Sequence, residues 1–86
     1  MDKDEKIVHK FMPIVLRRFR DRAGLSQQEL ADSIEVSKGF ISALEGGRSV
    51  PSLDRLLMLA DAFQVSPAAL MEALMEEMEK TKKQPY

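Results

Sequence analysis

The sequence of 86 residues contains no cysteine and a single histidine, His9. The lack of cysteine excludes disulfide bonds, thiolate metal sites and cysteine nucleophiles, and it fits a reducing cytosol. One imidazole without a cluster of carboxylates beside it provides neither a catalytic dyad nor a metal site. We therefore expect a protein that is not an enzyme and that uses no cofactor and no metal.

Long hydrophobic runs are also missing. No stretch approaches the roughly 20 apolar residues that a membrane span needs, and the first residues are too polar and acidic for a secretory signal. We therefore expect a soluble, cytoplasmic protein with no membrane partner. With 44% hydrophobic residues the chain can form one modest core, which predicts a single domain over residues 1–86.

An excess of positive charge, the usual mark of a domain that binds nucleic acid, is absent because the net charge is −1. The charges are nevertheless unevenly placed. One short stretch is basic (Arg17, Arg18, Arg20 and Arg22), and another is acidic (Glu72, Glu76, Glu77 and Glu79). A basic face and an acidic end can coexist in a nearly neutral chain, so the net charge argues against a DNA partner without excluding it. We interpret the acidic run as a solvated helix face.

No segment alternates apolar and polar residues as a half-buried strand would, and the few glycines and prolines separate segments with helical spacing. We predict an all-α, compact fold of five helices. The first helix ends at Gly24. It begins either at Pro13 or, through a kink, in an N-terminal helical extension at about residues 4–11.

Serines mark the starts of the other four helices. Ser26 and Glu29 form a capping box at the start of the second helix, which runs to about Ile34. The other three N-caps are Ser37, Ser52 and Ser66. Gly46 and Gly47 should end the third helix, Pro67 suits the first position of the last helix, and a frayed tail should follow Glu79.

Two short helices joined by a tight turn form the unit that inserts a helix into the DNA major groove. Residues 25–31 (LSQQELA), 34–37 (IEVS) and 40–48 (FISALEGGR), followed by Pro51, closely resemble the helix-turn-helix domains of the lambda repressor/Cro family, also called the XRE family. The resemblance covers about residues 12–74. It implies a compact lambda-repressor-like core, a helix-turn-helix motif at about residues 26–45, and a flexible tail at about residues 80–86.

The resemblance also implies the residues that bind DNA: Gln27, Ser37, Lys38, Gly39, Ser42, Ala43 and Arg48. Gln27 would contact a phosphate at a helix N-terminus, and Arg48 would touch the backbone beyond the recognition helix. Of the five that lie on the recognition helix, residues 37–39, 42 and 43, only Lys38 has a long donor that reaches guanine, so we expect sparse direct readout of bases. The alternatives are an exposed residue at a helix start for Gln27 and a solvated loop charge for Arg48.

Two further positions follow from the resemblance. Arg20 and Glu45 occupy the places of a structural ion pair between the first helix and the end of the recognition helix, with exposure of both to water as the alternative. Glu35 stands in the tight turn where the family usually has glycine, because that residue takes a positive φ. A side chain there costs on the order of 1 kcal/mol, which the turn can tolerate.

Surplus apolar surface predicts a homodimer. Five residues are expected to line one side of the last helix: Leu70, Met71, Leu74, Met75 and Met78. Together with Ile7, Val8 and Phe11 they exceed what so small a domain can bury. A two-fold dimer would place its recognition helices about 34 Å apart on a symmetric operator. Self-association through the N-terminal extension is the alternative.

Two functions therefore stay open. The first is a DNA-binding transcriptional regulator, a repressor or autoregulator bound to double-stranded DNA in the cytoplasm and so associated with the nucleoid. Stand-alone domains of this size resemble controller proteins of restriction-modification systems, antitoxins and compact phage-type repressors. The second is a protein-interaction module on the same fold, such as an antitoxin-like partner or one that tethers a regulator. The low net charge and the Gly39 and Ala43 surface favour the second.

Overall fold

The structure is a computed structural model that describes residues 7–83, and all of its regular elements in that range are helices. In chain order they are α2 (Ile7–Ala23), α3 (Gln27–Ser33), α4 (Lys38–Glu45), α5 (Leu53–Phe63) and α6 (Pro67–Lys83). The prediction of an all-α fold of five helices is confirmed.

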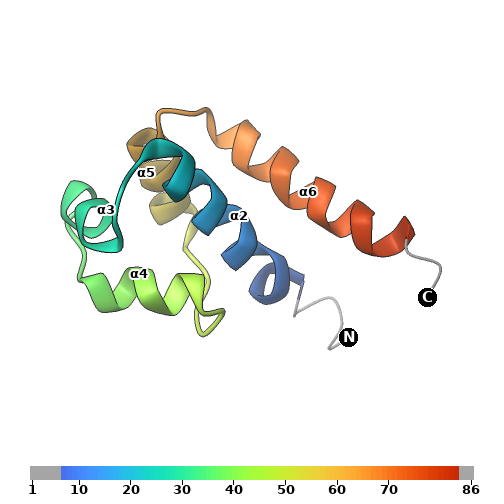
Figure 1. The fold of residues 1–86 in the computed structure, drawn as a ribbon, viewed down its shortest axis with the longest axis horizontal. Coiled ribbons are helices and arrows are strands. Elements are labelled where there is room, and N and C mark those ends of the chain that lie inside the picture. Colours follow the sequence, from blue (N-terminus) through green and yellow to red (C-terminus); the bar gives the residue numbers. More distant parts are fainter. Residues whose placement is uncertain (1–6, 84–86) are drawn as a thin grey trace.

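The helices form two parts that share α2 (Figure 1). The short helices α3 and α4 pack against each other at one end of the molecule, and α4 also packs against α2. The long helix α6 packs against α5 and then runs beside α2 in the opposite direction. Helix α2 therefore connects the α3–α4 pair with the long C-terminal helix.

Helix α2 runs without a break through Pro13. The prediction of a start at Pro13 is wrong, and the alternative of a helical extension is right from Ile7 onward; residues 4–6 lie outside the described residues. Proline at this position removes the N–H that would bond to the His9 carbonyl. Gly47, at φ +78°, packs closely there: a Cβ on it would lie 3.2 Å from the His9 oxygen and 3.6 Å from Pro13 Cγ. Only glycine therefore fits this contact.

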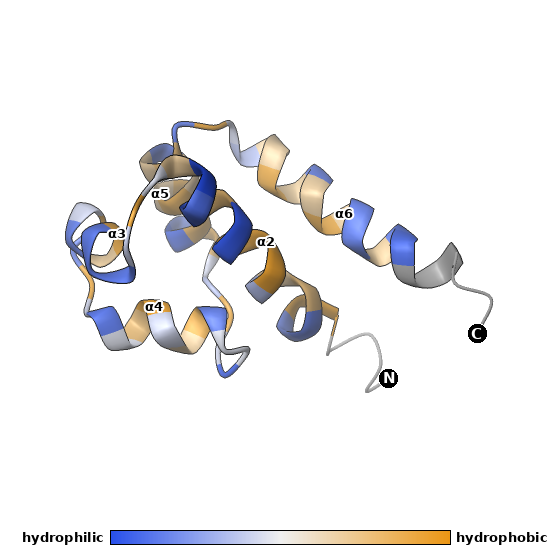
Figure 2. Cartoon of the chain, in the orientation of Figure 1, coloured by the Kyte–Doolittle hydropathy of each residue, from blue (hydrophilic) through white to orange (hydrophobic). Residues whose placement is uncertain are grey.

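Every helix contributes apolar side chains to one core, and Figure 2 shows hydrophobic and hydrophilic residues interspersed along the helices. The most deeply buried large side chains are Val15, Leu16, Leu30, Ile41, Leu44, Leu59 and Leu70. Phe11 is buried as well, while Ile7 and Val8 are partly buried against the core. The core thus takes up these three residues at least in part, and the apolar surplus of the predicted set is left on α6, where Met71 and Met75 are exposed.

The four serine N-caps are confirmed. The hydroxyl oxygens of Ser26, Ser37, Ser52 and Ser66 accept hydrogen bonds of 3.0–3.2 Å from the backbone N–H groups of Glu29, Phe40, Arg55 and Ala69. The capping box is complete, since the Ser26 N–H also donates to Glu29 Oε1 at 2.8 Å. Short-range sequence signals therefore set the start of these four helices.

The last helix is longer than expected. It continues to Lys83, so the prediction of a tail from residue 80 is wrong; residues 84–86 lie outside the described residues. Glu77 is buried and binds both Arg18 of α2 and Lys80, at 3.1 Å from the latter. These contacts tie the C-terminal half of α6 to α2.

No single helix in residues 7–83 is long and apolar enough to cross a membrane; α5 and α6 reach that composition only jointly, across a bend of 102°.

Candidate nucleic-acid interface

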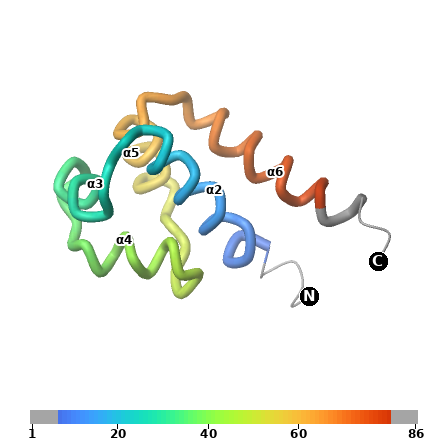
Figure 3. Tube along the Cα trace, viewed as in Figure 1, coloured from blue at the N-terminus to red at the C-terminus, as the bar shows by residue number. Residues whose placement is uncertain are grey.

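The turn between α3 and α4 sets the angle at which α4 is presented (Figure 3). Glu35 adopts φ +61°, the left-handed conformation expected for this position. The Val36 N–H then donates to the Ala31 carbonyl at 3.0 Å. Ala31 is fully buried, which lets the two helices approach closely. The turn therefore keeps its geometry without the usual glycine.

Helix α4 has one buried side and one accessible side. Ile41 and Leu44 point into the core at 1% exposure. The other side carries five of the seven residues expected to bind DNA, and we call them the recognition face: Ser37, Lys38, Gly39, Ser42 and Ala43. The first three are exposed and the last two are half-buried. Lys38 is the one charged residue on this face.

A bidentate ion pair fixes the C-terminal end of α4 to α2. Arg20 Nε lies 2.5 Å from Glu45 Oε2, and Arg20 Nη2 lies 3.0 Å from Glu45 Oε1. The side chains are only 11% and 4% exposed. Arg20 also donates to the Leu25 carbonyl at 2.8 Å, which joins the loop before α3 to the same group.

Gln27 is a third member of this network. Its amide Nε2 donates to Glu45 Oε1 at 3.0 Å, so the first residue of α3 is held against the last residue of α4. Burial alone would raise the pKa of Glu45, but hydrogen bonds from Arg20 and Gln27, with the charges of Arg20 and Arg17, hold that pKa below its ordinary value. The hydrogen bond to Glu45 in turn raises the pKa of Arg20. No local spacing connects positions 27 and 45, so sequence reasoning missed the contact.

The four clustered arginines of α2 have different surroundings. Arg20 binds Glu45, Arg18 binds Glu77 on α6, and Arg22 lies 5.3 Å from the Phe19 ring centre. Arg17 is exposed and helps to line a shallow hollow beside Glu45. Arg17 therefore places a positive charge next to the end of α4; the sequence had indicated it as part of a basic stretch but not as a DNA-binding residue.

Arg48 lies just beyond α4. Its backbone N–H donates to the Ala43 carbonyl at 2.9 Å, and its guanidinium rests over Gly46, where an added Cβ would lie 2.8 Å from Nη1. The residue is exposed. Its charge therefore stays near the C-terminal end of α4, where cations interact favourably with the helix dipole.

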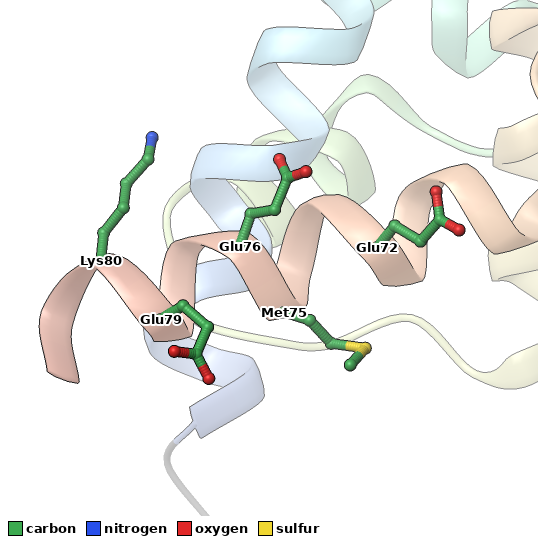
Figure 4. A pocket seen from close by; sticks show the side chains of 5 residues that line it. All are labelled: Glu72, Met75, Glu76, Glu79 and Lys80. Carbon is green, nitrogen blue, oxygen red and sulfur yellow. The ribbon is translucent and has the colours of Figure 1, made fainter. Parts of the chain in front are cut away.

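The five residues expected to form a dimer interface do not share one face. Leu70 and Leu74 are buried at 0% and 5% exposure, and Met78 packs partly buried against the core, so the prediction is wrong for Leu70 and Leu74. Met71 and Met75 are exposed at 43% and 60%. Met75 helps to line a hollow with Glu72, Glu76 and Glu79, and Figure 4 shows Met75 and Glu79 extending to one side of α6 while Glu72 and Glu76 extend to the other.

The family model described as "Helix-turn-helix domain" matches residues 14–74 of this chain. Among curated relatives, the "HTH-type transcriptional regulator DdrOP3" of Deinococcus deserti is 34% identical over 59 residues, which cover 69% of this chain and 46% of that protein. The "Transcriptional regulator ClgR" of Mycobacterium tuberculosis is 36% identical over 59 residues, 69% of this chain and 53% of that protein. The chain thus spans about half the length of these relatives.

Solved structures give the same relationship. A crystal structure of the clp gene regulator ClgR from Corynebacterium glutamicum matches with a TM-score of 0.81 and 29% identity, over 87% of this chain and 80% of that chain. A second crystal structure of ClgR from the same organism matches with a TM-score of 0.77 and 31% identity, over 83% and 92% of the two chains.

Proposed function

This chain belongs to the helix-turn-helix domain family, and we propose that it is a sequence-specific, DNA-binding transcriptional regulator whose helix α4 enters the major groove. One observation carries the proposal. The Arg20, Glu45 and Gln27 side chains lock α4 to α2 and α3, while the recognition face is left uncovered. A rigid helix with an accessible outer side is what readout of base edges requires. The names of the curated relatives, which are transcriptional regulators, agree with it.

The proposed contacts divide into phosphate and base contacts. Gln27 donates one amide hydrogen to Glu45 and has a second one for a phosphate. Arg48, just beyond α4, contacts the DNA phosphate backbone. Arg17 adds a phosphate contact from α2, since it is exposed beside Glu45. Lys38 reaches base edges. The remaining members of the recognition face lie against the groove without long donors.

We assign the chain, within its family, to the lambda repressor/Cro (XRE) group. The bidentate pair of Arg20 with Glu45 and the positive φ of Glu35 support this assignment, because both occupy the positions that the resemblance implies. The proposed role is that of a repressor or autoregulator. A domain that only covers its DNA site can block transcription without needing a further activity.

The proposed assembly is a homodimer on a two-fold symmetric operator. Met71 and Met75, both exposed, supply the apolar contact on α6, and Met75 lines a hollow together with Glu72, Glu76 and Glu79. Methionine adapts to irregular partner surfaces, which suits a small interface of this kind. Dimerisation would double the number of phosphate contacts, which offsets the low net charge of each chain.

The experiment begins by enriching duplexes from a randomised library with the purified protein. Binding of the enriched duplex and of a shuffled duplex is then followed by fluorescence anisotropy at about 50 and 200 mM salt, since neutralisation of several phosphates costs orders of magnitude in affinity between these salts. The proposal expects tight binding of the enriched duplex with a steep salt dependence. Failure to enrich any duplex would reject DNA binding and favour the protein-interaction module, for which Leu53, 72% exposed on α5, offers an apolar contact.

A further inference from the structure

Gly39, the second residue of α4, has no reason within the protein to be glycine. The glycines with positive φ are Gly24 and Gly47, so Gly39 has an ordinary helical backbone. A Cβ built at Gly39 would meet one neighbouring atom within 4 Å, Ser37 Oγ at 3.8 Å, which is an ordinary contact. Neither the conformation nor the packing of the described residues therefore requires the missing side chain.

The other serine-capped helices provide a direct comparison. The second residue after the serine is Gln28 in α3, Asp54 in α5 and Ala68 in α6, and all three are exposed, as Gly39 is. The position thus tolerates side chains of different size and charge. Glycine also lowers the stability of a helix relative to alanine, because it loses more backbone freedom on folding. The stability of the free protein alone would therefore favour a residue other than glycine at position 39.

We propose that Gly39 is a specificity-determining residue of the DNA-binding site, where its missing Cβ lets the first turn of α4 lie directly against the duplex. The inference rests on the proposed function. Gly39 follows Lys38 on the recognition face, and so it lies beside the one long donor of that face. When the backbone of α4 approaches the duplex closely at Gly39, the short side chains of Ser37, Ser42 and Ala43 also come within contact distance of the groove. Because Gly39 offers no side-chain hydrogen bond, it would discriminate between DNA sequences by the shape of the groove.

The test replaces Gly39 with alanine, serine and leucine and measures binding to a duplex that the wild-type protein enriches from a randomised library. Ala68 supplies matched controls, since it is the second residue of a helix whose serine cap, Ser66, makes the same hydrogen bond. The substitutions Ala68→Ser and Ala68→Leu introduce the same side chains at the corresponding position of α6, far from α4. The reverse change, Ala68→Gly, measures the intrinsic effect of glycine on thermal stability at this helix position.

The expected result separates stability from binding. Gly39→Ala should melt at or above the wild-type temperature, yet its affinity for the enriched duplex should fall about tenfold, and Gly39→Leu should lose more. Affinity for a shuffled duplex should not change, and the Ala68 variants should bind the enriched duplex as the wild type does.

Two results would overturn the inference while DNA binding by the wild type stands: Gly39→Leu binding the enriched duplex as tightly as the wild type does, or Gly39→Ala melting well below it. If the wild type enriches no duplex, the proposed function fails and this inference fails with it.

Discussion

Arg20 and Glu45 meet in a two-point ion pair although 25 positions separate them in the chain, and Gln27 donates to the same carboxylate. Three helices therefore converge on one carboxylate whose side chain is 4% exposed. The group has a structural role, because it holds α4 in place. It also has a proposed role in binding, because Gln27 is thereby aimed from the start of α3.

Replacement of Arg20 by alanine should destabilise the fold. It leaves the Glu45 carboxylate buried without its cation, which should lower the free energy of unfolding by about 3 kcal/mol. Urea denaturation of the wild type and the variant measures the difference. Arg22→Ala is the matched control, since Arg22 is exposed on the same helix and only lies over Phe19, and it should cost less than about 1 kcal/mol. Equal stability of the Arg20 variant and the wild type would contradict the structural role.

Acid should weaken the protein through the same carboxylate. The folded-state pKa of Glu45 is below its ordinary value, so its contribution to stability is complete above the unfolded-state pKa of about 4.3 and is lost as the pH falls through the folded-state value. The pKa of Glu77 is lowered too, by Lys80 and Arg18. Melting temperatures measured between about pH 7 and pH 2 should therefore fall more steeply for the wild type than for the Glu45→Gln, Glu77→Gln double variant. Parallel curves would show that these two groups do not drive the acid response.

The turn of the motif should become more stable with glycine. Glu35 has φ +61°, a conformation that costs a residue with a side chain on the order of 1 kcal/mol. Glycine removes this strain, but part of the gain is offset because glycine also raises the conformational entropy of the unfolded chain. Glu35→Gly should therefore raise the free energy of unfolding by about 0.5 kcal/mol. The control is Glu72→Gly on the exposed surface of α6, which should lower it by about 1 kcal/mol. A loss of stability in the Glu35 variant would mean that its side chain makes a contact that outweighs the backbone strain.

The dimer interface can be tested with two exposed apolar residues on different helices. Met75→Glu, on α6, should abolish the dimer in sedimentation velocity and weaken binding to a two-fold symmetric duplex without unfolding the chain, because Met75 is 60% exposed. Leu53→Glu, on α5, changes a residue that is 72% exposed and should leave the dimer intact. The reverse pattern would move the interface to α5, and a wild-type monomer at all concentrations would reject the homodimer.

Local signals were the most predictable part of this fold. The serine caps act over three residues, so Ser26, Ser37, Ser52 and Ser66 could be assigned from the sequence alone. Pro13 was harder to interpret, since a local rule disfavours proline inside a helix. Burial of Phe11 and Met12 just before Pro13, and of Val15 and Leu16 just after it, outweighs that local cost.

Contacts between distant segments were the least predictable part. The five leucines and methionines within nine positions of α6 cannot be divided into two faces by spacing alone. Only the packing against α2 and α5 separates Leu70 and Leu74 from Met71 and Met75. The hydrogen bond from Gln27 to Glu45 similarly depends on how α3 and α4 meet. The resemblance to a family supplied the Arg20 and Glu45 positions, which no local rule connects.

The central claim is that α4 and the residue beyond it hold DNA, and the most direct measurement compares three single charge removals on the duplex enriched by the wild type. Lys38→Ala and Arg48→Ala remove exposed charges at the proposed interface, and Lys80→Ala removes an exposed charge from α6. Arg48→Ala should weaken binding and reduce the slope of log affinity against log salt by about 1. Lys38→Ala should lower the preference for the enriched over the shuffled duplex. Lys80→Ala should do neither. Equal affinity for all three variants and the wild type would contradict the assignment of α4 as the DNA-binding helix.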